Sequence, residues 1–474
     1  MARTEAPPPP PLAPFQLVPI EENAERALAR DADRRRFLHR AVAVAVAASI
    51  VLVTLGLLAM QATNQQRFSP IDESAHLDYV LRALEGEFVH AGDRSDPTLL
   101  RELLCRGIDS PNWTWVTCSP DPQEFAAFAE GNANYLYVHP PVYYFLTAWT
   151  AKPLIDAGMV VLQAARLIDG VWLALGLLVL WHLLRREEVP PLARGVALLV
   201  VAAHPLMLFF GSTVTNDATA LLAGGLVLAA VFAWQRGRDP SVLRWLMLPA
   251  AASFAVSLKL TNFIVVMVAG IFLLLRAWWR EPPERERTPA AGRYLLASVL
   301  TVAGGVMVLV LWSALSPEKP DGFVDPMWTL YGVPMLSAAD LFGRLPDLVP
   351  PTRGAIAHSF LDYGAIVLIG LVFNWLLGIA SVVALVKGSP KLRALVVATL
   401  AGLVLGAIFI TLGNYLQQGV FIGRLPARYG FSAMPALGLL LACASTFRPM
   451  LVGFAGVGLA SVLVVGYGLV GLLL

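Results

Sequence analysis

The sequence has little charge, and it lacks the common signatures of soluble catalytic domains. Only 14% of its 474 residues are charged, whereas soluble domains carry about 25%. It has no Walker loop, dinucleotide-binding fingerprint, zinc-spaced Cys or His pair, or nucleophile elbow. No repeat with a period of about 20–50 residues is visible, which excludes solenoids and propellers. These absences leave no evident cytoplasmic site for ATP or a nucleotide sugar.

Long apolar runs are what the sequence has in abundance. Hydrophobic residues make up 57% of the chain, and the mean hydropathy is +0.66. We therefore expect an all-α polytopic membrane protein with about eleven transmembrane helices. The run from Leu243 to Trp279 is too long for one span, so we divide it near Lys259 to Asn262. The expected spans are 41–60, 164–184, 194–211, 215–234, 243–259, 262–280, 294–315, 363–386, 393–412, 427–446 and 450–472.

The basic residues predict the orientation of these spans. Many of the 35 Lys and Arg residues lie in short segments, which the positive-inside rule places in the cytoplasm. This pattern holds only if the apolar segment 139–157 does not cross the membrane, so we expect a helix at the outer interface there. Tyr143, Tyr144 and Trp149 would be its aromatic anchors. The basic segments are 1–40, 185–194, 236–244, 276–293 and 387–393, with Arg448.

Two units and two large loops follow from this topology. Residues 1–40 are expected to be a disordered, basic cytoplasmic terminus, and residues 41–474 a transmembrane domain. Loops 61–163 and 316–362 would face outward from a bacterial plasma membrane. Two of the three cysteines, Cys105 and Cys118, share the first loop. They can form a disulfide if that loop is extracytoplasmic, and otherwise they are two unrelated thiols.

The first loop opens with the acidic motif Asp72-Glu73-Ser74-Ala75-His76, about a dozen residues after the first expected span. Neighbouring residues point in different directions on either a helix or a strand, so Asp72 and Glu73 are not expected to share one proton. One carboxylate can serve as a general base or a metal ligand while the other holds backbone or substrate. The alternative is a solvated helix start capped by Ser69 or Asp72.

Other polar residues are expected on the same outer face. Lys259 lies about 22 Å along a helix from Arg244, short of the roughly 30 Å hydrocarbon core, so it would lie at the depth of a lipid phosphate. A lysine that snorkels to the interface is the alternative. The other residues can bind an anion or line a cavity, or else cap helices and anchor the membrane edge. This group comprises His76, His139, Asn216, Asp217, Arg424, Arg428 and Tyr429.

Five motifs follow one another along the chain, namely Pro70 to Tyr79, His139 to Tyr144, Thr215 to Ala218, Leu258 to Thr261, and Ala427 to Tyr429. In this order they resemble the GT-C superfamily of polyprenyl-phosphate-dependent glycosyltransferases, and most closely an uncharacterised bacterial branch of it. A further stretch, His358-Ser359-Phe360 to Tyr363-Gly364, is similar to the second-loop signature of that branch. The resemblance covers roughly residues 40 to 446.

The resemblance implies a GT-C fold with juxtamembrane helices in the first loop and an active site open to the outer leaflet. The implied donor is a sugar on a polyprenyl phosphate, commonly decaprenyl phosphate in actinobacteria, and the acceptor is a cell-envelope glycan, glycolipid or protein. Asp72 or Glu73 would activate the acceptor hydroxyl. Lys259, Arg428 and His139 would neutralise the departing phosphate. The resemblance leaves open a divalent metal near the acidic motif, with Glu73 and His76 as candidate ligands.

Other functions compete with this interpretation. A lipid-linked glycan transporter or flippase would place charges at the bilayer midplane, often within inverted repeats. A transferase of the O-antigen-ligase type would place its key arginines and large loop late in the chain. An inert scaffold is the remaining alternative. The early acidic motif and the gathering of charge on one face favour the glycosyltransferase.

Overall fold

The structure is a computed structural model. The residues that it describes are 20–109, 118, 134–236, 239–279, 289–316, 319–320, 323, 332–333, 364–418, 421–422 and 426–471. The chain divides into two units, Met1–Val46 and Ala47–Leu474, and every site residue discussed below belongs to the second.

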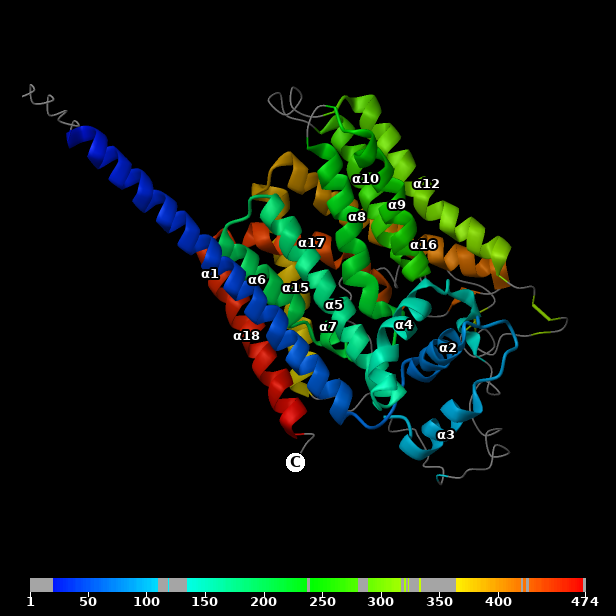
Figure 1. Ribbon diagram of the computed structural model, residues 1–474. Coiled ribbons are helices and arrows are strands. Elements are labelled where there is room, and N and C mark those ends of the chain that lie inside the picture. The colour runs from blue at the N-terminus through cyan, green and yellow to red at the C-terminus, as the bar shows by residue number, and fades with distance from the viewer. Residues whose placement is uncertain are drawn as a thin grey trace, which may run out of the picture. The chain divides into compact units, whose positions relative to one another are not determined.

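Helices dominate the described residues, as expected for the all-α class (Figure 1). The α-helices are α1 (Ile20–Asn64), α2 (Glu73–Glu85), α3 (Pro97–Arg106), α4 (Val142–Asp156), α5 (Val161–Arg186), α6 (Pro191–Ala202), α7 (Pro205–Phe210), α8 (Ala220–Gln235), α9 (Val242–Leu258), α10 (Phe263–Trp278), α12 (Ala291–Leu315), α15 (Gly364–Lys387), α16 (Pro390–Gln418), α17 (Met434–Ala444) and α18 (Arg448–Gly471). The 3₁₀ helices are η3 (Tyr135–Val138), η4 (Asn216–Thr219), η5 (Leu260–Asn262) and η6 (Ala427–Ala433). Two short strands, β1 (Gly332–Val333) and β2 (Phe421–Ile422), pair antiparallel, with Gly332 opposite Ile422.

The chain is a multi-pass membrane protein. Eight helices within the described residues are long and apolar enough to span a bilayer. Three more of the expected spans appear as shorter apolar helices, at Pro191–Ala202, Val242–Leu258 and Arg428–Ala444. Each of the eleven expected spans thus overlaps an apolar helix among the described residues, eight of them long enough to cross a bilayer and three of them shorter.

Two sequence expectations are corrected by the helix boundaries. Helix α1 begins at Ile20, so residues 20–40 are helical rather than disordered; this segment is rich in Ala, Glu and Arg, which favour helix. The expected span 194–211 is interrupted between α6 and α7. There His204 caps α7 by accepting a hydrogen bond from Leu206 N, and Pro205 occupies the first helical position. The break expected near Lys259 is confirmed, because Lys259 is extended between α9 and η5.

Small residues let the helices of the bundle approach closely. Helix α10 packs against α12 and α16, and α8 packs against α5 and α9. At Gly304 of α12, an added Cβ would lie 2.5 Å from the carbonyl oxygen of Pro249 in α9. Van der Waals contact of this kind is the main source of helix association in lipid, since burial from water contributes little there.

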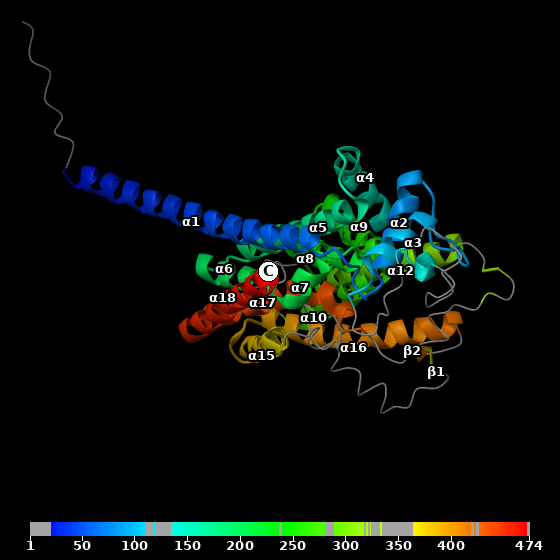
Figure 2. The same cartoon turned by 90° about the horizontal axis from the view of Figure 1, so that it is seen from below.

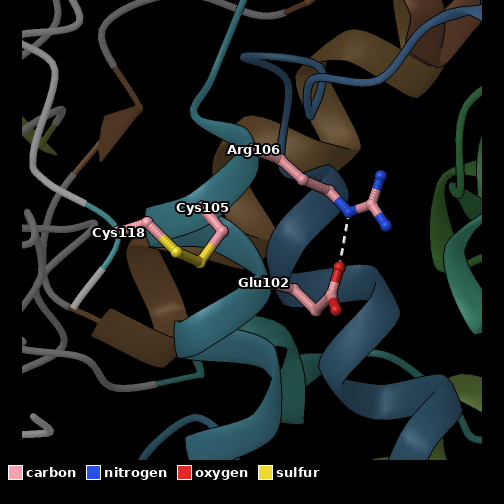
Figure 3. The surroundings of a disulfide bond; sticks show 4 residues. All are labelled: Glu102, Cys105, Arg106 and Cys118. Carbon is pink, nitrogen blue, oxygen red and sulfur yellow. Dashed lines mark hydrogen bonds and ion pairs between the residues drawn. A yellow bond between two sulfur atoms is a disulfide. The ribbon is translucent and has the colours of Figure 1, made fainter. Parts of the chain in front are cut away.

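The described part of the first loop forms a group of helices at one side of the bundle. Helices α2, α3 and α4 lie there together in both views (Figures 1 and 2), and α2 and α4 both pack against α5. Asp96 caps α3 by accepting from Thr98 N at 2.6 Å. Cys105 at the end of α3 forms a disulfide with Cys118 (Figure 3), so the alternative of two free thiols is wrong.

Candidate active site

Asp72 occupies the N-cap position of α2 without acting as a cap. Its side chain makes no capping hydrogen bond, and its backbone is left-handed, with φ 57° and ψ 3°. The carboxylate instead accepts hydrogen bonds from Tyr135 Oη at 2.7 Å and from Arg428 Nη2 at 2.5 Å. Arg428 lies 356 residues further along the chain. The motif of the first loop and the residues before α17 therefore meet in space.

Asp217 joins the two expected cations to this group. Its carboxylate forms an ion pair with the Lys259 ammonium, and its Oδ2 lies 3.2 Å from Arg428 Nε. The helix break after α9 directs Lys259 inward, and the Lys259 ammonium also lies 5.3 Å from the centre of the Tyr429 ring. Lys259 is buried, so it does not snorkel to the interface. Two carboxylates and two cations thus alternate in one network.

Exposure differs sharply within this network. The side chains of Asp72 and Arg428 are 23% and 16% exposed, whereas those of Asp217 and Lys259 are 2% and 3% exposed. The ion pair between Asp72 and Arg428 is therefore the part of the network that is most accessible from outside the protein. The pair between Asp217 and Lys259 lies behind it and neutralises charge that would be costly to bury alone.

Glu73 is enclosed on every side. Both carboxylate oxygens accept from Arg166 at 2.7 Å, one accepts from Ser69 N at 2.6 Å, and the other accepts from Val214 N at 2.8 Å. The side chains of Glu73 and Arg166 are fully buried. A carboxylate with about four lone-pair sites and four donors has no capacity left for a substrate.

His76 belongs to a stack of rings between α2 and α4. Its ring stacks on Tyr144, and its Nδ1 lies 3.0 Å from Tyr144 Oη. Its Nε2 lies 3.4 Å from Thr215 Oγ1, a weak contact. Burial lowers the pKa of His76 well below its ordinary value, with nearby His139, Lys259 and Arg428 contributing, so its imidazole is neutral.

His139 and Asn216 present polar atoms without protein partners. His139 stacks on His76, and its buried Nδ1 has no hydrogen-bond partner in the described part of the chain. Burial and the nearby Lys259 lower the pKa of His139 to about 3. Both amide atoms of the buried Asn216 likewise lack partners among the described residues. Thr215, rather than Asn216 or Asp217, caps η4 by accepting from Asp217 N.

The sequence reasoning missed three residues that shape the site. Arg166 holds Glu73, and Asp169 accepts from Tyr143 Oη and from Thr215 N. Arg166 and Asp169 lie at the start of an apolar run, and ionisable residues in such a place are functional candidates. That signal was available. The third residue, Tyr135, offers no comparable sequence signal.

The aromatic residues expected as membrane anchors in α4 differ in their exposure. Tyr143 and Tyr144 are fully buried, so they are not interfacial anchors; their hydroxyls face Asp169 and His76. Trp149 is 62% exposed, as an anchor would be. Arg424 and the stretch His358 to Gly364 lie outside the residues that the structure fully describes. No group of three or more His, Cys, Asp or Glu side chains within the described ranges is arranged to hold a metal ion.

Three solved structures resemble the fold of this chain. ArnT from Cupriavidus metallidurans bound to undecaprenyl phosphate is 18% identical, with a TM-score of 0.47, covering 88% of this chain and 62% of ArnT. The oligosaccharyltransferase of Archaeoglobus fulgidus in complex with Zn and sulfate is 15% identical, with a TM-score of 0.44, covering 90% of this chain and 52% of that one.

The apo form of the Archaeoglobus fulgidus enzyme is 13% identical, with a TM-score of 0.45, covering 86% and 51% of the two chains. This chain therefore spans less than two thirds of the length of the solved chains that it matches. No family model and no curated protein matches the sequence. The structural likenesses concern the fold and assign no role to any residue here.

Proposed function

We propose that this protein is a glycosyltransferase that moves a sugar from a polyprenyl phosphate to an extracytoplasmic hydroxyl acceptor. The observation that carries the proposal is the ion pair between Asp72 and Arg428, backed by Asp217 and Lys259. It brings a reachable carboxylate together with two cations in a membrane protein. These are the groups that a general base and a departing lipid phosphate require.

The division of labour follows from exposure and charge. The donor phosphate binds Arg428 and is stabilised by Lys259, displacing the Asp72 carboxylate from the guanidinium. Asp72 then accepts the proton of the acceptor hydroxyl as the acceptor oxygen bonds to the anomeric carbon. The bond from that carbon to the phosphate oxygen breaks, and polyprenyl phosphate leaves. One such displacement inverts the anomeric centre.

Asp72 is a better candidate for the base than Glu73. The four donors around Glu73 occupy its oxygens, and its side chain is fully buried. Asp72 is partly exposed and bonded to the reachable Arg428. Glu73 accordingly has a supporting role in the mechanism.

The remaining polar residues fit substrate recognition. His139 Nδ1 and the Asn216 amide hold unused hydrogen-bonding capacity, which a sugar or phosphate oxygen can fill. The Tyr429 ring lies within cation–π distance of both cations, with its centre 5.3 Å from the Lys259 ammonium and 5.9 Å from the Arg428 guanidinium carbon. The disulfide between Cys105 and Cys118 supports an oxidising, extracytoplasmic setting for the first loop.

The proposal is tested by separating binding from transfer. Decaprenyl phosphate serves as the probe for donor binding, and membranes incubated with radiolabelled decaprenyl-phosphate sugars report transfer. Asp72→Asn should lower transfer about 100- to 10,000-fold, because it removes the base. The same variant should bind decaprenyl phosphate more tightly, by about three- to tenfold, since the competing carboxylate loses its charge.

Arg428→Lys and Lys259→Ala should change donor binding in the opposite direction. Each removes or reshapes a phosphate contact, so each should weaken decaprenyl phosphate binding about 10- to 100-fold. Asp156→Asn is the matched control, because Asp156 is an exposed carboxylate paired with Lys152 at the far end of α4. Full transfer by Asp72→Asn would exclude the proposed base. Unchanged binding in both cation variants would exclude the phosphate site.

A further inference from the structure

The backbone at Asp72 adopts a conformation that residues with a Cβ rarely enter. Its φ of 57° lies in the left-handed region, where the side chain crowds the following carbonyl oxygen. Asp tolerates this region when its side chain bonds locally, but the Asp72 side chain makes no capping bond. The Asp72 carboxylate bonds instead to Tyr135 and Arg428, which are remote in sequence. The left-handed conformation is therefore stabilised by tertiary contacts, and the contacts of the residue next to Asp72 act on its backbone most directly.

Glu73 supplies those contacts directly next to Asp72. Its two oxygens bind Arg166 as a two-pronged fork, and they also accept from Ser69 N and Val214 N. These bonds reach three separate parts of the fold, which are the entry to α2, helix α5 and the segment before η4. The position of Glu73 is thereby fixed from several directions at once.

Arg166 extends the same cluster to the backbone before α2. Its Nη1 donates to the carbonyl of Gln65 at 2.5 Å, and its Nη2 donates to the carbonyl of Arg67 at 2.8 Å. The chain that leads from α1 into Asp72 is thus held on the same guanidinium that holds Glu73. The planar fork of arginine suits this geometry, and the point charge of lysine does not.

We propose that Glu73 and Arg166 are positioning residues that hold Asp72 in its left-handed conformation and direct its carboxylate at Arg428 and Tyr135. The reactive role of Asp72 rests on the proposed function, whereas the conformational role of the pair does not. Glu73 and Asp72 are adjacent in sequence and opposite in task. Glu73 is fully buried and holds the backbone, whereas Asp72 is partly exposed and can contact a substrate.

Glycine and alanine at position 72 report the backbone conformation. Both variants lack the carboxylate, but only glycine enters the left-handed region without a steric penalty. In purified full-length protein, Asp72→Gly should therefore melt about 2 °C above Asp72→Ala. The difference between these two melting temperatures measures how firmly position 72 is held left-handed.

The same pair of variants is then compared in an Arg166→Lys background. Lysine keeps the buried charge but loses the fork, so position 72 can relax and the glycine advantage should fall by at least half. Arg276→Lys is the matched control, because Arg276 is also buried but lies at the end of α10 and donates to Trp279 O. It should leave the glycine advantage intact. Glu73→Gln gives a second test of the pair if Arg166→Lys is not recovered folded.

Equal melting of the glycine and alanine variants would overturn the claim of a held left-handed backbone. An undiminished glycine advantage without the fork would overturn the role of the pair. Failure of both Arg166→Lys and Glu73→Gln to fold would show a requirement for folding rather than positioning, and would overturn it too. Failure of decaprenyl phosphate to bind would remove only the proposed function, because the melting comparison needs no ligand.

Discussion

At the scale of single residues, the site relies on neutral histidines beside charged groups. His76 is buried and lies between Tyr144 and Thr215, and its pKa is held well below its ordinary value of 6.5. His139 behaves similarly, with a pKa of about 3. Neutral imidazoles can exchange hydrogen bonds with a sugar without adding to the positive charge of Lys259 and Arg428.

Because the pKa of His76 is lowered in the folded protein, His76 should make the folding stability depend on pH. Below about pH 6.5 the unfolded chain binds a proton at His76 and the folded chain does not, so stability falls as pH falls, by at most about 1.4 kcal/mol per pH unit. His76→Gln should therefore flatten the decline in melting temperature between pH 7 and pH 5. His90→Gln is the control, since His90 is half exposed. A slope unchanged by His76→Gln would show that His76 is protonated in the folded protein.

At the scale of elements, the apolar runs of the sequence predicted where helices lie better than they predicted where those helices break. Most of the expected spans overlap helices of similar extent, because a bilayer fixes the length of an apolar segment. The exceptions are 41–60, where α1 is longer, 194–211, which is divided, and 427–446, where α17 is shorter. The break at Lys259 could be predicted, because the run was too long for one span. The break at His204 and Pro205 was missed, although a proline inside an apolar run is a signal for it.

The contact between α8 and η6 places Arg428, and Gly224 controls it. A Cβ on Gly224 would lie 1.9 Å from the carbonyl oxygen of Ser432 in η6, so Gly224→Ala must push η6 away. We expect a loss of about 1–3 kcal/mol of stability and, in folded protein, decaprenyl phosphate affinity at least about tenfold weaker. The control is Gly453→Ala, since Gly453 of α18 faces open space. Equal decaprenyl phosphate affinity and equal stability in both variants would show that the contact between α8 and η6 does not position Arg428.

At the scale of the whole molecule, the sequence predicted that four charged residues gather on one face, but not how they pair. Asp72, Asp217, Lys259 and Arg428 were all expected on one face, and the structure brings them into one network. Their pairing depends on helix packing across hundreds of residues, which local patterns do not encode. The bond between Glu73 and Arg166 spans 93 positions and was missed for the same reason.

Two independent features of the chain predict its orientation in the membrane. The positive-inside rule predicts that the basic segment 185–194 lies in the cytoplasm, and the disulfide between Cys105 and Cys118 favours the oxidising side for α3. Arg101 of α3 and Glu188 after α5 are both exposed. Arg101→Cys and Glu188→Cys, each made with Cys443→Ser, therefore provide one reporter for each side.

A membrane-impermeant maleimide added to intact cells should label Arg101→Cys at least about tenfold more than Glu188→Cys, because the bilayer shields cytoplasmic thiols. After the cells are opened, the two variants should label equally, which controls for thiol reactivity. The reverse pattern in intact cells would place Asp72 and Arg428 in the cytoplasm. A lipid-linked donor in the outer leaflet could not then reach them, and the proposed reaction would fail with the topology.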